Sequence, residues 1–232
     1  MIEKLLAWTR RWITRSANAG SSFQPYKNVA VDQVYNLLFC DDLELFRANE
    51  GEPAGDLAVV LSAEPNREAL EKIANDPGRE SRVRTLAFNR LRAANLSVPS
   101  RRLLGVIVEV PQKGGLDVLA AFTDGSIRHI NQTGKLAVFE RAPEKLAQKL
   151  AELIRVSQIV VNKIGPWNRP RLPPPGPGKI RMTFLVSDGL YFGEGPSAQM
   201  QRDRFASPVL RTAAELLELV VETALDVNKG ME

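Results

Sequence analysis

The stretch LLGVIVEVPQKGGLDVLAAFTDGSIRHINQTGKLAVFE, residues 103–140, decides the fold of this chain because strand and turn signals alternate along it. Its four apolar runs are residues 103–110, 116–123, 127–131 and 136–140. The runs carry β-branched and aromatic residues, which suit a pleated surface, and the segments between them carry the glycine, aspartate and asparagine that turns require. The stretch therefore predicts a four-stranded antiparallel meander.

A second hairpin is predicted nearer the C-terminus. Residues 179–186 and 190–192 are largely apolar and flank the turn Ser187-Asp188-Gly189, a combination typical of a β-hairpin. With this hairpin the sheet is expected to have about six strands. Residues 193–204 follow as a predicted polar loop.

Two long amphipathic helices are predicted to cover the sheet. The first spans residues 143–164, and the second begins at Ser207, with Ser207 as the N-cap and Pro208 in the first turn. Apolar residues recur along one face of each helix at helical spacing. The predicted fold class is therefore α+β, an antiparallel sheet packed against two long amphipathic helices, with an N-terminal helical region before it.

The N-terminal region is expected to contain shorter helices. They are predicted over residues 31–46, 55–62, 66–74 and 80–94, the third capped by Asn66. The domain division places a basic amphipathic helix and a flexible linker in residues 1–28, a helical subdomain in residues 29–98 and the sheet domain in residues 99–232. The alternative is that residues 29–232 form a single domain, which their length permits.

The net charge of +4 arises in the N-terminal segment. Residues 1–28 hold five basic side chains against Glu3 alone, and the rest of the chain carries 26 basic and 26 acidic side chains. The charge of the body is therefore no sign of a general phosphate-binding surface. Three interpretations of the segment stay open: a helix docked on the body, a peripheral membrane or partner-binding helix, and a cleaved targeting peptide.

Seven arginines lie within residues 79–102 and face only one acidic residue, Glu80. At about 100° per residue, these arginines surround the predicted helix instead of gathering on one side. We therefore expect local ion pairs and packing of their aliphatic stems. An anion or nucleic-acid patch is the alternative.

One histidine and one cysteine limit the chemistry that the chain can carry. A lone Cys40 leaves no intrachain disulfide, and neither residue type is numerous enough for a histidine- or cysteine-rich metal site, so no metal and no cofactor are expected. No Gly-x-Ser-x-Gly motif accompanies His129, and a structural role in a strand is the favoured interpretation. The catalytic residues are unknown from this pattern; the candidates are His129, Glu109 and Asp117.

The segment GPWNRPRLPPPGPG, residues 165–178, is rich in proline and is called the proline segment below. Its prolines favour an extended polyproline II form. The favoured interpretation is a stiff crossover back to the sheet, with Trp167 packed against the body, and the alternative is docking on an aromatic groove of a partner. The binding candidates here and in the later polar loop are Trp167, Arg169, Arg171, Glu194, Gln199 and Arg202.

These patterns favour a non-catalytic interaction or ligand-binding module with a protein partner or a small ligand. Nucleic-acid or acidic-membrane binding through residues 1–28 and 79–102, with peripheral membrane contact by residues 1–15, is one alternative. A hydrolase or transferase built around His129 is the other. A cytoplasmic location is expected from the single cysteine and from the lack of a run of about 18 apolar residues, which a transmembrane helix needs.

Overall fold

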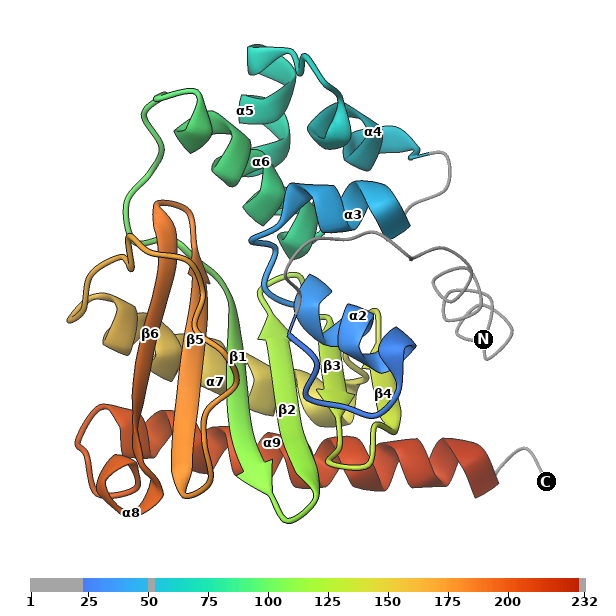
Figure 1. The fold of residues 1–232 in the computed structure, drawn as a ribbon, viewed down its shortest axis with the longest axis vertical. Coiled ribbons are helices and arrows are strands. Elements are labelled where there is room, and N and C mark those ends of the chain that lie inside the picture. Colours follow the sequence, from blue (N-terminus) through green and yellow to red (C-terminus); the bar gives the residue numbers. More distant parts are fainter. Residues whose placement is uncertain (1–22, 50–52, 230–232) are drawn as a thin grey trace.

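The computed structural model describes residues 23–49 and 53–229, and its centre is one antiparallel sheet with helices on both faces (Figure 1). The six strands have the order β4-β3-β2-β1-β5-β6. They are β1 Leu103–Gln112, β2 Gly115–Phe122, β3 Ile127–Ile130, β4 Leu136–Phe139, β5 Lys179–Val186 and β6 Gly189–Pro196. β1 to β4 form the predicted meander, and the hairpin of β5 and β6 joins it because β5 pairs with β1. The predicted α+β fold with six strands is confirmed.

The helices pack on the sheet from two sides. They are α2 Val29–Leu37, α3 Leu43–Asn49, α4 Gly55–Leu61, α5 Arg67–Asn75, α6 Ser81–Ala93, α7 Glu144–Val161, α8 Ser197–Met200 and α9 Ala206–Lys229. In Figure 1, α7 and α9 run behind the strands and α2 lies in front of them. Within the described ranges, no helix combines the length and the apolarity that a membrane crossing needs.

Each face of the sheet has its own hydrophobic cluster. Leu153 of α7 and Leu216 of α9 join Val106 on one face. Tyr35 of α2 and Phe88 of α6 are in the cluster on the other face, so the N-terminal helices share a core with the sheet. This alternation follows from the pleat, which sends successive strand side chains to opposite faces.

The single helix predicted over residues 31–46 is wrong, because the chain breaks between α2 and α3. Cys40 has a φ of 53°, in the left-handed region that ends a helix. The carboxylate of Asp42 then accepts a hydrogen bond from the backbone N–H of Leu45 at 3.0 Å and caps α3. The pair Asp41-Asp42 therefore marks the start of a new helix, although it lies within residues 31–46, whose apolar side chains recur at helical spacing.

Three other predicted element boundaries can be compared with the structure. The cap predicted at Asn66 is confirmed, because its side chain accepts from the N–H of Ala69 at 3.0 Å. The N-cap predicted at Ser207 is wrong: α9 begins at Ala206, and Asp203 accepts from the N–H of that residue at 2.8 Å. The polar loop predicted over residues 193–204 is wrong in its first part, because β6 stays paired with β5 as far as Pro196. The interpretations of residues 1–22 lie outside the described residues.

Gly115 begins β2 where a side chain has no room. An added Cβ would lie 2.0 Å from the carbonyl oxygen of Gln132, a backbone atom that cannot swing aside. Gly115→Ala is therefore expected to lower the free energy of unfolding by about 2 kcal/mol or more, measured by urea denaturation.

The matched control for this substitution is Gly193→Ala in β6, where an added Cβ meets no atom within 4 Å. Its stability should be unchanged or slightly higher, because alanine restricts the unfolded chain more than glycine does. Equal losses in the two variants would contradict the close contact at Gly115.

Candidate functional site

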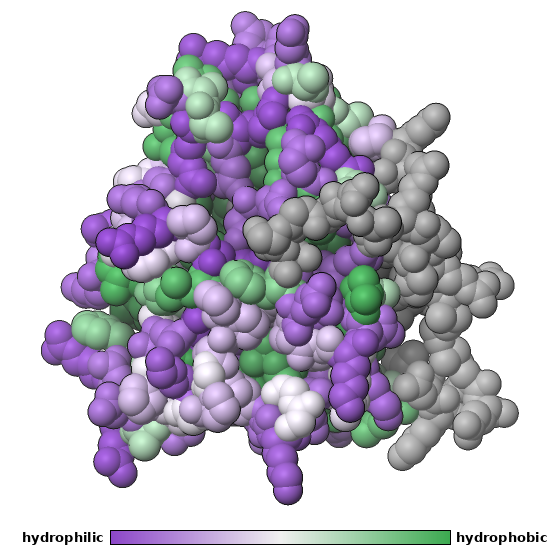
Figure 2. Space-filling view, in the orientation of Figure 1, coloured by the Kyte–Doolittle hydropathy of each residue, from purple (hydrophilic) through white to green (hydrophobic). Residues whose placement is uncertain are grey.

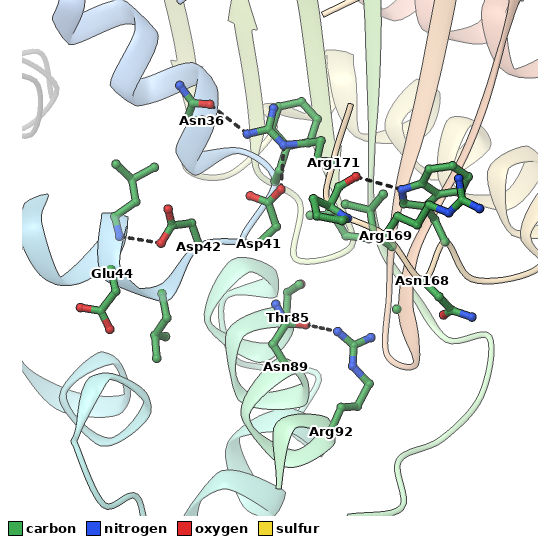
Figure 3. A pocket seen from close by; sticks show the side chains of 18 of the residues that line it. Asn36, Asp41, Asp42, Glu44, Thr85, Asn89, Arg92, Asn168, Arg169 and Arg171 are labelled. Atoms are coloured by element: carbon green, nitrogen blue, oxygen red, sulfur yellow. Dashed lines mark hydrogen bonds and ion pairs between the residues drawn. The ribbon is translucent and has the colours of Figure 1, made fainter. Parts of the chain in front are cut away.

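A cleft of about 700 Å³ lies where the N-terminal helices, the proline segment and the β5–β6 turn meet (Figure 3). Its polar lining residues are Asn36, Asp41, Asp42, Glu44, Thr85, Asn89, Arg92, Trp167, Asn168, Arg169, Arg171 and Asp188. Phe23, Phe39, Leu43, Leu45, Pro170, Leu185, Gly189 and Leu190 complete it. The cleft thus depends on three parts of the chain that are far apart in sequence.

The break between α2 and α3 shapes one wall of the cleft. Because the chain turns at Cys40, the side chains of Asp41 and Asp42 reach the cleft instead of lying along a continuous helix (Figure 3). The side-chain amide of Asn89, on α6, donates to the carbonyl oxygen of Cys40 and holds the turn against that helix.

Arg171 ties the proline segment to α2. Its Nε donates to Asp41 Oδ2 at 2.7 Å and its Nη2 donates to Asn36 Oδ1 at 2.9 Å. The guanidinium carbon lies 3.9 Å from the ring centroid of Phe39 and 4.8 Å from that of Phe23, within cation–π range. The side chain is only 9% exposed, and its Nη1 has no hydrogen-bond partner in the described part of the chain.

A buried carboxylate, Glu109, lies on the same face of the sheet. The hydroxyl of Tyr35 donates to Glu109 Oε1 at 2.7 Å, and Arg181 Nη1 lies 3.9 Å from Glu109 Oε2. Burial raises the pKa of Glu109, although the hydrogen bond from Tyr35 and the charges of Arg181 and Arg171 oppose the rise.

Arg181 connects this carboxylate to the neighbouring strand and to the proline segment. Its Nε donates to Glu194 Oε2 at 2.9 Å, and its Nη1 donates to the carbonyl oxygen of Leu172 at 3.1 Å. Burial tends to raise the pKa of Glu194, but hydrogen bonds from Arg181 and Lys179 outweigh it, and the pKa is lowered. The two glutamates beside one arginine therefore have opposite pKa shifts.

Trp167 fastens the proline segment to the edge of the sheet. Its backbone N–H donates to the carbonyl oxygen of Leu190 at 2.7 Å, and its ring meets Phe192 edge-on at 4.9 Å between centroids. The guanidinium of Arg169 lies 5.5 Å from the centroid of Trp167. The segment therefore crosses from α7 to β5 with Trp167 packed on the body, as predicted.

The binding candidates divide into two groups. Trp167, Arg169 and Arg171 line the cleft. Glu194 instead holds Arg181 and Lys179 within the sheet, and Gln199 and Arg202 lie on or just after α8, outside the lining. Further cleft residues were not predicted from the sequence; they lie in the α2–α3 connection, at the start of α3 and on α6, and are Asp41, Asp42, Glu44, Asn89 and Arg92. The paired aspartates were the available signal, since they also mark the start of α3.

The catalytic candidates do not converge. His129 Nε2 lies 3.7 Å from Asp117 Oδ1 on the face covered by α7 and α9, whereas Glu109 points to the opposite face with Tyr35. Burial lowers the pKa of His129 and the charge of Asp117 opposes this. None of the three lines the cleft.

The seven arginines of residues 79–102 all have partners within the chain, but among the described residues the predicted local ion pairs are found only at Arg79 and Arg82, and the other five bond neutral carbonyl or amide oxygens. Two of them, Arg82 and Arg84, are buried. The partners are Asp56 and Asp76 for Arg79, Glu80 for Arg82, the Ala74 carbonyl for Arg84, the Ser62 carbonyl for Arg90, Asn89 for Arg92, the Asn162 carbonyl for Arg101 and Asn75 for Arg102.

In comparisons with protein-family models, curated proteins and solved structures, nothing matches this chain. Among the residues that the structure describes, no three His, Cys, Asp or Glu side chains gather in a way that could hold a metal ion. What the cleft can do therefore has to be argued from its own side chains.

Arg171→Lys is expected to loosen the proline segment while keeping the charge. Lysine cannot bond Asp41 and Asn36 in the same plane or stack on Phe39, so local stability should fall by about 2 kcal/mol. Hydrogen exchange at the Trp167 amide, which bonds Leu190, measures this loss.

Arg169→Lys is the matched control for that substitution. Arg169 is exposed and makes no hydrogen bond or ion pair with another described residue, so exchange at the Trp167 amide should change by less than about 0.5 kcal/mol. A similar change in both variants would show that Arg171 does not hold the segment.

Glu109→Gln and Glu194→Gln are expected to respond to pH in opposite directions. Because the pKa of Glu109 is raised above its ordinary 4.5, the stability contributed by its neutral form is present at low pH and is lost as pH rises through the raised pKa. Glu109→Gln should therefore gain stability relative to the wild type as pH rises above about 4.5.

The stability contributed by Glu194 changes with pH in the opposite direction, because the pKa of Glu194 is lowered. Its contribution is present above its ordinary pKa and is lost as pH falls through the lowered value, so Glu194→Gln should be most destabilised near neutral pH. Urea denaturation of both variants between about pH 3 and 8 tests the pair. Parallel pH profiles for the two variants would contradict the assignment.

Proposed function

We propose that this protein is a non-catalytic ligand-binding module and that its ligand is a small molecule held in the cleft. The observation that carries the proposal is the cleft, whose volume of about 700 Å³ lies within the range of small-molecule sites. Some of its polar groups, those of Arg171, Asp41, Asn36 and Asn89, are held by hydrogen bonds, so a ligand meets them already in place.

The lining favours binding over catalysis. The described residues around the cleft include no histidine, cysteine, serine, lysine or tyrosine, so its candidate bases are carboxylates. Those of Asp41, Asp42 and Glu44 are engaged with Arg171, with the backbone N–H of Leu45 and with Arg47, which suits positioning more than proton transfer. The hydroxyl of Thr85 donates to the carbonyl oxygen of Ser81 and is not oriented by a neighbouring base. His129 lies on the other side of the sheet.

A small ligand is favoured over a broad protein interface. On the face drawn in Figure 2, hydrophilic residues dominate and hydrophobic residues appear in small groups. An extended apolar patch is the usual mark of a large docking surface. The cleft, in contrast, is where arginine, carboxylate, amide and indole groups come together.

Native mass spectrometry of the full-length protein, purified gently from its own host and then incubated with the low-molecular-mass fraction of that host, tests the proposal. We expect a fraction of the protein to carry an added small-molecule mass. This fraction should fall at least about tenfold in Trp167→Ala, which removes the indole from the cleft. Gln199→Ala, outside the cleft, and His129→Ala should keep that mass.

The proposal would be contradicted if the protein showed only its bare mass both as purified and after incubation with the low-molecular-mass fraction. So would an added mass that survives in Trp167→Ala once urea denaturation has shown that this variant is folded. A turnover that disappears in His129→Ala while the fold persists would assign the protein to catalysis instead.

A further inference from the structure

The walls of the cleft carry opposite charges. Asp41, Asp42 and Glu44, here called the acidic wall, come from the α2–α3 connection and the start of α3. Arg169 of the proline segment and Arg92 of α6, here called the basic wall, lie on the other side (Figure 3). A ligand in the cleft therefore meets negative charge at one end and positive charge at the other.

The acidic wall keeps acceptor capacity for a ligand. Asp41 Oδ2 accepts from Arg171, Asp42 Oδ1 caps α3 and Glu44 pairs with Arg47, so each carboxylate uses one oxygen. The second oxygen of each has no hydrogen bond from another described residue, and an ionised carboxylate accepts several. Glu44 is 72% exposed, and a surface pair of this kind is weak enough to be exchanged for a ligand.

The basic wall has open donors. Arg169 stacks on Trp167 but makes no hydrogen bond or ion pair within the described chain, which leaves its five N–H groups available. Arg92 donates from Nη2 to Asn89 Oδ1, its one hydrogen bond to a described residue. Asp188 lies beside Arg92 and offsets part of its charge, so Arg169 is the stronger anchor for an anion.

Arg171 closes the cleft between the two walls. Its side chain is nine-tenths buried, and its Nη1 is buried without a hydrogen-bond partner among the described residues. Because Arg171 already bonds Asp41 and Asn36, its charge is used within the chain, and the two walls supply the charges that a ligand meets.

A ligand with one sign of charge would be attracted by one wall and repelled by the other. We infer that the cleft binds a small zwitterion, its cationic group at the acidic wall and its carboxylate or other anionic group at Arg169. This inference rests on the proposed function and names the class of ligand.

Three probes with a common benzene ring differ only in the charges they carry. 4-(Aminomethyl)benzoate is zwitterionic, benzoate is anionic and benzylamine is cationic. Each is titrated into the ¹⁵N-labelled full-length protein, and the shifts of the Trp167 indole and of the Asp42 and Arg169 amides are followed. We expect the zwitterion to bind at least about tenfold more tightly than either single charge.

Two substitutions assign the ends of the ligand. Arg169→Gln should weaken the zwitterion and benzoate at least about fivefold, and it should bind benzylamine at least as tightly as the wild type because a repelling charge is gone. Asp42→Asn, which keeps a side-chain oxygen to cap α3, should weaken the zwitterion and benzylamine and bind benzoate at least as tightly as the wild type. Arg211→Gln is the control, since Arg211 is an exposed residue of α9 outside the cleft, and it should change none of the three affinities.

Each other result overturns the inference. If benzoate or benzylamine binds as tightly as the zwitterion and shifts the same cleft signals, the zwitterion class is wrong while the ligand-binding function stands. Binding of a terminally blocked Lys-Ala-Ala-Glu peptide without binding of the small zwitterion would make the cleft a peptide site. Failure of the proposed function is distinguishable, because then no probe moves a cleft signal and native mass spectrometry shows the bare chain.

Discussion

The buried carboxylate of Glu109 connects three parts of this structure, which are α2, the sheet and the proline segment. A charge taken out of water is costly unless partners compensate for it, and Glu109 has Tyr35 at 2.7 Å and Arg181 at 3.9 Å. Tyr35 belongs to α2, and Arg181 also binds Glu194 of β6 and the Leu172 carbonyl of the proline segment. Because Glu109 Oε2 already lacks a hydrogen bond from a described residue, losing Tyr35 or Arg181 would leave the carboxylate still less compensated, and this shared dependence links helix, sheet and proline segment.

Arg171 extends this network to the surface and creates the cleft. It bonds Asp41 and Asn36 while stacking on Phe39, which closes the proline segment against α2. Arg171 thus holds Asp41 and Asn36 in place, whereas Arg169 stays exposed. In the proposed function, preorganised groups lower the entropy cost of binding, and charged walls discriminate between ligands by the placement of their charges.

Local sequence signals predicted most of the fold and a smaller part of the site. The meander was predictable because each turn carries its own glycine, aspartate or asparagine, and Trp167, Arg169 and Arg171 were identified because they interrupt a proline-rich run. The α2–α3 break was missed because residues 31–46 are apolar at helical spacing, and the left-handed φ of Cys40 is not written in its residue type. β6 was predicted too short because Gly193, Glu194 and Gly195 favour a loop, whereas pairing with β5 keeps them extended.

Periodicity and turn chemistry act between residues close in the chain, so the class of the fold, the order of strands within the meander and the helices that cover one face of the sheet follow from local sequence. Which polar groups meet depends on the tertiary structure. Arg171 donates a hydrogen bond to Asp41, which is 130 residues away in the sequence, and Tyr35 donates one to Glu109, which is 74 residues away. Such pairs depend on the packing of whole elements, and no local pattern distinguishes an arginine that will be buried against a carboxylate, such as Arg171, from one that stays exposed, such as Arg169.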